Sequence, residues 1–584
     1  MPHQSHPASR PPASRHPVSR RAVLGSTAAA LVGLTVTPSA RAAALSLTAA
    51  RAVTTAGTTL EAAAAPAGAT GYRRLTAGPG YPLVVREELA TARPGRDERR
   101  TGRLAFAHLT DLHMLDAQSP VRFEWLTLVN GSAFRPHEAL GTQGGVSLVR
   151  RLNAITAAPW TGLPLSCAVS TGDNTDNHEH VELDWFIRVL SGGEITPNTG
   201  AATRWEGVQA SGDKRYYNPE LPVVDRYKAA GFPQLPGFLD RAMATHSSPG
   251  LSMPWYAVFG NHDDSISGVL PSASPLAAAY TGSLKLNGFP DPEAAAALQK
   301  AVTHPGVAAP AAADTRPTSS WRVTPDARRA PFTPQQFMAA HLRADATGPG
   351  PVGHGFTQDA VDSGRGYYTF PLAPGITGIS LDSTNRAGWT DGSIDDVQWR
   401  WLADVLTRGS SRYDDWAGVE RRHQVQDELF VLFSHHTSGT MGNLALPLDG
   451  TGIRHAGVEL VAMLKHYPNV LAWVNGHTHA NKITAQRGRT PAHSFWEINT
   501  ASHIDFPQHA RLIEVADNAD GTLSIFTTLV ESDAPYQASY TDGSPQALAS
   551  VYREMSFNDL HADLGQLGTP ADRNTELLLV NPLA

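Results

Sequence analysis

Five short stretches of the chain carry aspartate, asparagine and histidine at spacings that suit metal binding. Carboxylate, amide and imidazole groups are ligands for hard or borderline divalent cations, and none of the five stretches contains a cysteine. The stretches are Asp111-Leu112-His113, Gly172-Asp173-Asn174-Thr175-Asp176, Gly260-Asn261-His262-Asp263, Ser434-His435-His436 and Gly476-His477-Thr478-His479. Together they supply seven ligands, a number that suits two divalent ions better than one structural zinc.

Each stretch directly follows an apolar run with the length of a buried β-strand. A sixth run has no such stretch after it, and helical patterns such as residues 396–406 lie between some of the runs. The runs are residues 104–109, 165–170, 255–259, 376–381, 429–433 and 470–474. Because strand ends meet along one edge of a sheet, ligands that are distant in the sequence can share one centre. The pattern predicts an α/β sandwich with its site at the strand ends.

In their order along the chain, the five stretches resemble the motifs D-x-H, GD-x-x-D, GNH-D, H and GH-x-H of the calcineurin-like metallophosphoesterase superfamily. The resemblance covers residues 103–512. It implies a two-sheet β-sandwich flanked by helices, the four-layer fold of that superfamily, here with long insertions. Segments such as residues 110–120 and 398–402 resemble exported actinobacterial members in particular.

The resemblance also implies which residues bind metal. The implied ligands of one ion are Asp111, His113 and His479, those of the other are Asn261, His435 and His477, and Asp173 bridges the two ions. The identity of the ions stays open among manganese, iron, zinc and a mixed-valence pair, because all of them accept oxygen and nitrogen ligands. His436 is expected to lie outside the ligand set.

The implied reaction is hydrolysis of phosphomonoesters or phosphodiesters by a hydroxide that bridges the two ions. Ions about 3.5–4 Å apart bind phosphate oxygens and lower the pKa of the water between them. His262 matches the histidine that faces the leaving group, and Asp176 matches the acid that orients this histidine. Purple acid phosphatases have a tyrosine where this chain has Asp176, so we expect a colourless or weakly coloured protein.

Several other polar residues lie near the motifs without matching a family role. These residues are His178, His180, His503 and Asp505. They could contact the substrate, or they could be supporting or surface residues. The single cysteine, Cys167, lies inside the apolar run before Asp173 and is expected to be a core residue. One cysteine also excludes an intrachain disulfide.

The N-terminal 42 residues carry five arginines and no acid around an apolar stretch, residues 22–36, that is too short to span a bilayer comfortably. Arg20 and Arg21 before this stretch resemble the twin-arginine export signal, and Ala40-Arg41-Ala42 offers a cleavage site. A disordered basic arm and an uncleaved anchor are the alternatives. We expect export by the twin-arginine machinery, to the outside of the cell or to its envelope, of a mature protein without a membrane span.

The chain as a whole has the composition of a globular protein, with 584 residues, 41% of them hydrophobic and 17% charged. The net charge of -7, which becomes -12 without residues 1–42, argues against general nucleic-acid binding. Residues 43–102 are expected to form a linker and a peripheral segment, residues 103–512 the catalytic domain, and residues 513–584 a C-terminal extension. Insertions at about 190–254 and 265–365 either wall a substrate cleft or decorate the surface.

Two alternatives to a general phosphoesterase remain. The first is a non-catalytic secreted binding protein whose core is stabilised by metal, but such a protein usually loses ligands, whereas all seven ligand positions and His262 are present. The second is a nucleotidase. About 70 residues follow the last motif region, too few for the large substrate-binding domain of periplasmic nucleotidases. We therefore expect a metal-dependent phosphoric ester hydrolase, either a phosphatase or a phosphodiesterase.

Overall fold

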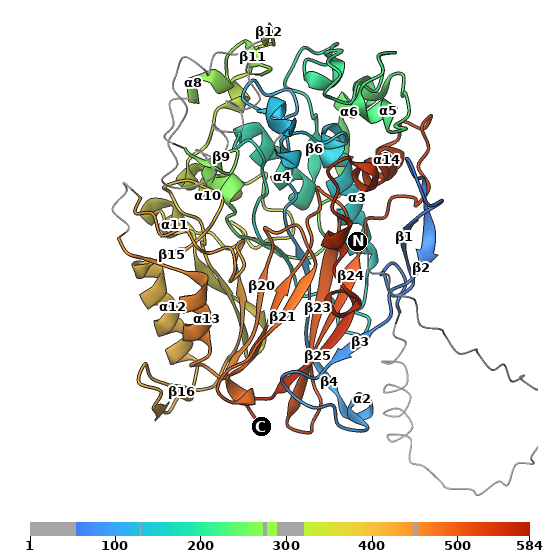
Figure 1. The fold of residues 1–584 in the computed structure, drawn as a ribbon. Helices are drawn as coiled ribbons and strands as arrows, with labels where there is room; N and C mark the ends of the chain where they lie inside the picture. The colour runs from blue at the N-terminus through green and yellow to red at the C-terminus, as the bar shows by residue number, and fades with distance from the viewer. Residues whose placement is uncertain (1–53, 129, 273–276, 289–319, 448–451) are drawn as a thin grey trace, which may run out of the picture. The chain divides into compact units, whose positions relative to one another are not determined.

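The computed structural model describes residues 54–128, 130–272, 277–288, 320–447 and 452–584 (Figure 1). The chain divides into two units, residues 1–52 and 53–584, and the expected export signal lies outside the described residues. The predicted α/β class is confirmed, because the second unit combines two large sheets with many helices. Among the described residues, no helix combines the length and the apolar character that crossing a membrane requires.

The first large sheet has seven strands in the order β3-β25-β24-β23-β4-β5-β8. Their bounds are Val84–Arg86, Thr575–Val580, Thr522–Val530, Ala510–Asp517, Thr101–Leu109, Ala168–Ser170 and Trp255–Ala257. Strands β4, β5 and β8 run parallel, and β23 pairs antiparallel with β4. The segments expected as a peripheral N-terminus and a C-terminal extension thus supply β3, β24 and β25 to this sheet.

The second large sheet has six strands in the order β13-β14-β18-β20-β22-β21. Their bounds are Tyr368–Ala373, Ile376–Ser380, Leu429–Phe433, Val470–Asn475, Phe495–Asn499 and Lys482–Gln486. Strands β14, β18, β20 and β22 run parallel. Every residue of β18 and β20 is buried, as expected for parallel strands that are covered on both faces.

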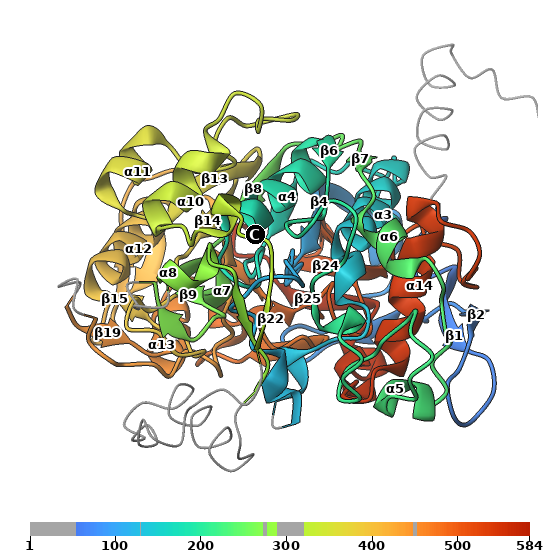
Figure 2. The same cartoon turned by 90° about the horizontal axis from the view of Figure 1, so that it is seen from above.

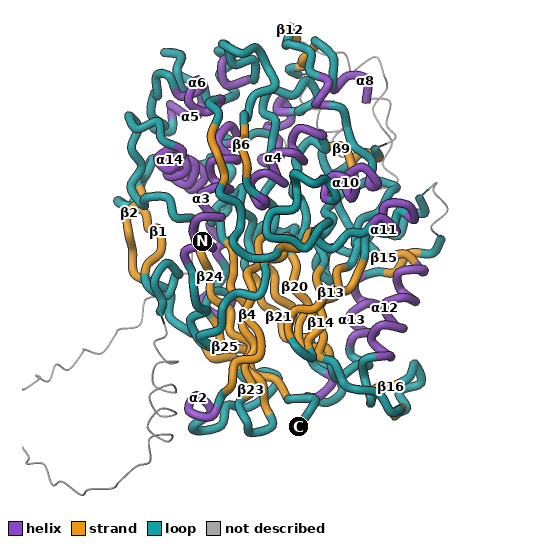
Figure 3. The backbone as a smooth tube through the Cα atoms, turned by 180° about the vertical axis from the view of Figure 1, so that it is seen from behind, coloured by secondary structure: helices purple, strands orange, loops and turns teal. Residues whose placement is uncertain are grey.

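The two sheets pack face to face around one hydrophobic core, to which both contribute. Phe106 of β4 meets Phe433 of β18 edge to face, with ring centroids 5.6 Å apart. Cys167 lies in this core, as predicted. Helices α3 (Gly141–Ala154) and α4 (His180–Ser191) pack on the outer face of the first sheet, and α12 (Asp396–Arg408) and α13 (Gly457–Leu464) cover the second (Figures 2 and 3).

The remaining elements are short or lie in the insertions. Helix α14 (Pro545–Asn558) packs against α3, and Glu554 on it forms an ion pair of 2.9 Å with Arg74 of the segment before β2. The other helices are α2 (Arg96–Arg99), α5 (Arg226–Ala229), α6 (Phe238–Met243), α7 (Asn261–Asp264), α8 (Ala277–Tyr280), α10 (Pro334–His341) and α11 (Gln358–Ser363). The other strands are β1 (Ala62–Pro66), β2 (Leu75–Pro79), β6 (Gly193–Ile195), β7 (His246–Ser248), β9 (Ser265–Ile266), β10 (Leu270–Pro271), β11 (Leu284–Leu286), β12 (Ser320–Arg322), β15 (Ile394–Asp395), β16 (Arg412–Asp414), β17 (Glu420–Arg422) and β19 (Arg454–His455).

Candidate metal centre

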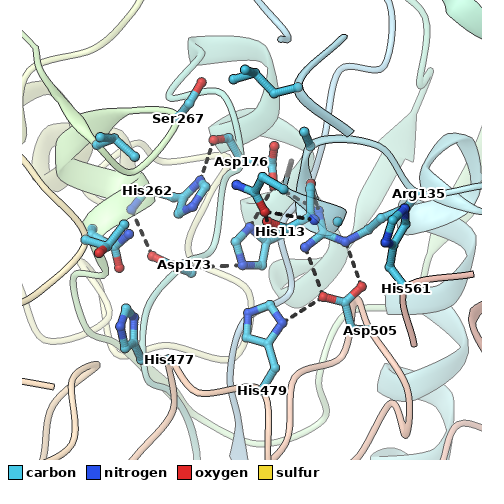
Figure 4. A pocket seen from close by; sticks show the side chains of 18 of the residues that line it. His113, Arg135, Asp173, Asp176, His262, Ser267, His477, His479, Asp505 and His561 are labelled. Atoms are coloured by element: carbon cyan, nitrogen blue, oxygen red, sulfur yellow. Dashed lines mark hydrogen bonds and ion pairs between the residues drawn. The ribbon is translucent and has the colours of Figure 1, made fainter. Parts of the chain in front are cut away.

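The seven residues expected as metal ligands lie together where parallel strands of both sheets end. Strands β4, β5 and β8 lead to the ligands contributed by the first sheet, and β18 and β20 lead to those of the second. The possible metal-binding atoms of six of the seven, together with those of His262 and His436, fall into groups of three within 4.8 Å of one another; the groups are Asp111, His113 and His479; His113, Asp173 and His262; Asp111, Asp173 and His435; and His435, His436 and His477. Figure 4 shows several of these side chains pointing into a common space.

Asp111, His113 and His479 form what we call the first half-site. Asp111 Oδ1 lies 3.2 Å from His479 Nε2 and 3.9 Å from His113 Nε2. The other oxygen of Asp111 accepts hydrogen bonds from Thr110 Oγ1 at 2.7 Å and from the main-chain nitrogen of His477 at 3.0 Å. These two bonds fix the carboxylate and leave Oδ1 facing the two imidazoles.

The three other expected ligands, Asn261, His435 and His477, are what we call the second half-site. His435 Nε2 lies 3.1 Å from His477 Nδ1, and its own Nδ1 bonds the carbonyl oxygen of Thr171 at 2.8 Å. The amide nitrogen of Asn261 donates to the carbonyl oxygen of Gly268 at 3.1 Å, which orients its side-chain oxygen as the available ligand atom. The three ligand atoms are one amide oxygen and two imidazole nitrogens, a set that suits a borderline divalent cation.

Asp173 faces both half-sites. Its Oδ2 atom lies 3.6 Å from His113 Nε2 in the first and 3.1 Å from His435 Nε2 in the second. Its Oδ1 atom accepts the main-chain N–H of His262 at 2.9 Å, which holds the carboxylate in this position. A carboxylate in this position can contact two cations at once.

His436 also has a ring nitrogen close to His435 and His477. Both of its ring nitrogens are nevertheless engaged, Nδ1 with Ser383 Oγ at 2.8 Å and Nε2 with the carbonyl oxygen of Thr390 at 2.9 Å. These bonds hold the ring of His436 in place and occupy both nitrogen atoms that could otherwise bind a metal ion.

Three buried atoms of the two half-sites have no hydrogen-bond partner, namely Asp111 Oδ1, His113 Nε2 and Asn261 Oδ1. Burial of a polar atom without a partner is costly, and for a carboxylate the cost is especially large. Cations at the two half-sites would satisfy all three atoms. The residues present therefore fit a pair of metal ions with oxygen and nitrogen ligands.

The charges of the site also favour the binding of cations. Burial lowers the pKa of a histidine, but at His435 the neighbouring aspartates, led by Asp173, outweigh this effect and raise the pKa to about 9. At His479 burial is likewise outweighed, chiefly by Asp111, and the pKa is raised to about 10. At His477 burial dominates and lowers the pKa to about 3. Bound cations would take the place of the protons that the carboxylates hold on these histidines.

The backbone carries left-handed conformations at five of the seven expected ligands. The φ angles are 52° at Asp111, 43° at His113, 49° at Asp173, 72° at His477 and 55° at His479. For residues other than glycine such conformations are uncommon and cost about 1–3 kcal/mol each, and they cluster at functional sites. The strand-end loops thus bend sharply to aim these side chains inward.

Asp176 and His262 are joined differently from what the family pattern implies. The carboxylate of Asp176 accepts a hydrogen bond from His113 Nδ1 at 2.8 Å and a second one from Arg122 Nη1. His262 Nδ1 instead donates to the main-chain oxygen of Asp176 at 2.6 Å. Asp176 therefore orients His262 through its carbonyl group, because its side chain is turned toward the first half-site and Arg122. The Nδ1 bond leaves Nε2 as the ring atom that can act in the cavity.

Two arginines beside the site belong to none of the sequence motifs. Arg135 holds Asp505 through two bonds, Nε to Oδ1 at 2.6 Å and Nη2 to Oδ2 at 2.9 Å, and Asp505 accepts His479 Nδ1 at 2.8 Å (Figure 4). Arg122 holds Asp176 and also Glu138, at 2.9 Å. In a chain this rich in arginine, residue type alone could not single out these two.

Four polar residues near the motifs, His178, His180, His503 and Asp505, matched no family role. Of these, Asp505 contacts the expected ligand His479 and lines the cavity. His178 is buried with its ring 4.1 Å from that of Phe332, and His503 is buried 6.0 Å from the ring of Tyr552. His180 begins helix α4. These three histidines do not line the cavity described next.

A cavity of about 400 Å³ lies over the two half-sites. His113, Asp173, His262, His477 and His479 line its floor, together with Asn261, Asp176 and Asp505. Ile266, Ser267, Val269 and Leu270 line it as well, so this part of the expected insertion at 265–365 does wall the cavity. The volume lies in the range typical of small-molecule sites, about 300–1,000 Å³.

Comparisons with known proteins identify no family for the chain. No protein-family model matches it, and no curated protein matches it. Among solved structures, it is similar to a dimetal phosphatase from Danio rerio, at 11% sequence identity and a TM-score of 0.35, over 74% of this chain and 99% of the other. Such a TM-score is too low to establish a shared fold. The case for a function rests on the side chains of the site.

Proposed function

We propose that the protein is a metal-dependent phosphoesterase with the calcineurin-like metallophosphoesterase fold, hydrolysing phosphomonoesters or phosphodiesters. The observation that carries the proposal is the position of Asp173, whose Oδ2 faces a ligand histidine of each half-site at 3.1–3.6 Å. The two face-to-face sheets with helices outside agree with the fold that the sequence motifs imply.

Asp111, His113 and His479 would hold one ion, Asn261, His435 and His477 the other, and Asp173 both. Two divalent cations, when bound, polarise phosphate oxygens and lower the pKa of water, which is the chemistry that ester hydrolysis at phosphorus requires. The buried aspartates balance the charge of the cations, and the bonds to Thr110, Thr171 and Gly268 keep the ligand atoms directed at them. The protein thus provides a rigid frame for two ions.

His262 would act on the leaving group. Its ring lies 4.7 Å from the ring of His113, at the edge of the first half-site, and it lines the cavity. The bond from Nδ1 to the carbonyl oxygen of Asp176 fixes the ring, so that Nε2 is the atom that donates a proton to a departing alkoxide. A positioned general acid of this kind contributes about 10²- to 10⁴-fold in rate.

The test is hydrolysis by purified protein that is first stripped with a chelator and then loaded with manganese, iron or zinc. We expect release of phosphate or cleavage of a diester with at least one of these metals, and its loss in Asp173→Asn. A matched control is Asp404→Asn, an exposed aspartate on α12 paired with Arg408. Full metal binding without hydrolysis of any mono- or diester would contradict the proposal and support a metal-stabilised binding protein instead.

We further propose that residues 1–42 direct export by the twin-arginine route. The support is the pair Arg20-Arg21 before the apolar residues 22–36 and the small residues around Arg41. Replacing both arginines of the pair by lysine keeps the charge and should leave the precursor inside the cell. Normal export and processing of the double-lysine form would contradict this route.

A further inference from the structure

One side of the cavity is an apolar wall built from two segments. Phe123 and Leu126 come from the segment after β4, and Ile266, Val269 and Leu270 come from the β9–β10 hairpin. Strands β9 and β10 pair antiparallel, with Ile266 opposite Leu270. The wall is therefore a folded element of the chain and not a scatter of single apolar side chains.

The wall rests on its own small hydrophobic core. Val121, Ile266 and Tyr280 are buried there, and Phe123 and Leu270 pack against them while remaining partly exposed. Tyr280 places its hydroxyl on the carbonyl oxygen of Asn177 at 2.7 Å, so this core is fixed to the motif that carries Asp176. The exposed parts of Phe123 and Leu270 thus have a rigid backing, as a recognition surface needs.

The wall lies on the leaving-group side of the site. The hairpin loop follows α7, the helix that carries Asn261 and His262, and its Gly268 accepts the amide N–H of Asn261 at 3.1 Å. Gly268 has a φ of 68°, and a Cβ atom there would collide with the ring of His262. Ser267 of the same loop lies beside His262 in Figure 4. A group that departs toward His262 Nε2 therefore meets the side chains of this hairpin.

The cavity offers little to a second negative charge. The arginines that line it, Arg122 and Arg135, are committed to carboxylates, Arg122 to Asp176 and Glu138 and Arg135 to Asp505. No lysine occurs among the described residues that line the cavity. Asp559 adds a further carboxyl group to the lining. Among the described residues of the lining, neither a lysine nor an uncommitted arginine would therefore pair with a second phosphate or carboxylate on the leaving group.

We propose that the substrate is a phosphate ester of an uncharged, apolar alcohol, and that Phe123, Leu126 and Leu270 determine this specificity. The inference rests on the proposed phosphoesterase function and adds its substrate class. The phosphate group would lie over the two half-sites, and the alkyl or aryl group of the alcohol would lie against the wall, where its burial contributes to binding.

The test compares two esters whose chains have the same length, heptyl phosphate and 2-(2-methoxyethoxy)ethyl phosphate, each also as its methyl diester. Two methylene groups of the first are ether oxygens in the second. Because burial of one methylene contributes about fourfold in binding, kcat/KM should favour the heptyl ester by about tenfold. A preference above threefold supports the inference, and a preference of threefold or less overturns it.

Variants of the wall residues test whether the wall causes the preference for the heptyl ester. Leu270→Asn should reduce the heptyl preference at least threefold, whereas Leu284→Asn, a matched control on β11 whose side chain is half exposed outside the cavity, should leave it unchanged. If Leu270→Asn lacks a cooperative thermal transition, Leu126→Asn takes its place. A preference that survives the folded wall variant undiminished would overturn the assignment of the wall.

The same assay separates this inference from the function on which it rests. If the metal-loaded protein cleaves nitrophenyl phosphates or phosphodiesters but neither chain ester, the substrate class is wrong and the phosphoesterase function stands. If it cleaves no phosphate ester at all, the function is wrong and the inference falls with it.

Discussion

The carboxylate of Asp505 accepts a hydrogen bond from His479 Nδ1 at 2.8 Å. Both of its oxygens are also held by Arg135. His113 of the same half-site has an equivalent partner in Asp176. In the second half-site, His435 Nδ1 instead bonds a neutral carbonyl group, that of Thr171. Carboxylate partners make a ligand imidazole more basic, so the two half-sites should hold their ions with different strengths.

The first prediction concerns Asp505. Asp505→Asn keeps the shape of the side chain but removes the charge behind His479, and partners of this kind are worth about 10- to 100-fold in metal affinity. We expect one of the two ions to bind about 10- to 100-fold more weakly and the other to bind as before. Titration of the metal-free protein with zinc, followed by calorimetry, measures both affinities. Asp559→Asn, in the same cavity but without a bond to a ligand histidine, is the control; equal affinities in Asp505→Asn and the unaltered protein would contradict the role.

The second prediction distinguishes the two contacts of Asp176. Because its side chain holds His113 and its carbonyl group holds His262, Asp176→Asn should weaken metal binding in the first half-site and leave His262 in place. Once saturated with metal, the variant should therefore show similar relative losses with alkyl and nitrophenyl leaving groups. A loss confined to alkyl esters at full metal occupancy would instead show that the side chain acts through His262.

The third prediction concerns His262 itself. His262→Ala should retain both metal ions and lose about 10²- to 10⁴-fold in rate on esters with alkoxide leaving groups. Nitrophenolate departs without a proton, so nitrophenyl esters should lose much less. Rates on matched alkyl and nitrophenyl phosphates measure the contrast, with metal content determined on the same samples. Equal losses on both esters would rule out proton donation, and loss of metal would make His262 a ligand.

The motifs could predict the candidate ligand positions from the sequence because residues at strand ends need no information about loops. Six of the seven expected ligands, spread over positions 111 to 479, have their possible ligand atoms within 4.8 Å of others in the set, and the seventh, Asn261, lines the same cavity. The direction of the Asp176 side chain depended on Arg122, which lies in an irregular segment with no periodic pattern. Nothing in the local sequence distinguishes an arginine that clamps a buried carboxylate from one that faces solvent.

Strand β24 in the C-terminal region was not predicted, for a different reason. Strand β24 is buried throughout but contains serine and threonine, so it has no continuous apolar run. These polar groups are satisfied by the neighbouring strand, Ser524 Oγ by Glu576 at 2.8 Å and Thr527 Oγ1 by Thr575 Oγ1 at 2.8 Å. Hydrogen bonds between side chains of adjacent strands depend on sheet order, which the pattern of one segment does not contain.

The fourth prediction concerns a buried ion pair below the cavity wall. Lys285 Nζ lies 2.8 Å from Glu124 Oε1, both side chains are buried, and burial raises the pKa of Glu124 to about 7 despite Lys285. Lys285→Met leaves Glu124 without its cation and should destabilise the protein by about 3–5 kcal/mol at neutral pH.

The pH dependence of this effect has a definite sign. Loss of Lys285 raises the pKa of Glu124 further, so the folded variant holds a proton that the unfolded chain releases near the ordinary glutamate pKa of about 4.3. Its stability must then fall as the pH rises from 5 to 8. Thermal unfolding of chelator-treated Lys285→Met, compared with the double variant that also carries Glu124→Gln, checks this. The prediction would be contradicted if Lys285→Met were less stable than the double variant by the same amount at pH 5 and at pH 8. It would also be contradicted if adding Glu124→Gln restored none of the lost stability.

The proposed dinuclear site depends on Asp173, since its Oδ2 faces both half-sites. Without this carboxylate two cations would repel each other with less charge between them to compensate. The direct test is the metal content of purified Asp173→Ala, Asp111→Ala and unaltered protein after loading with manganese or zinc and removal of the excess. We predict two equivalents in the unaltered protein, about one in Asp111→Ala and less than one in Asp173→Ala. Two full equivalents in Asp173→Ala would contradict a shared carboxylate and, with it, the two-metal phosphoesterase.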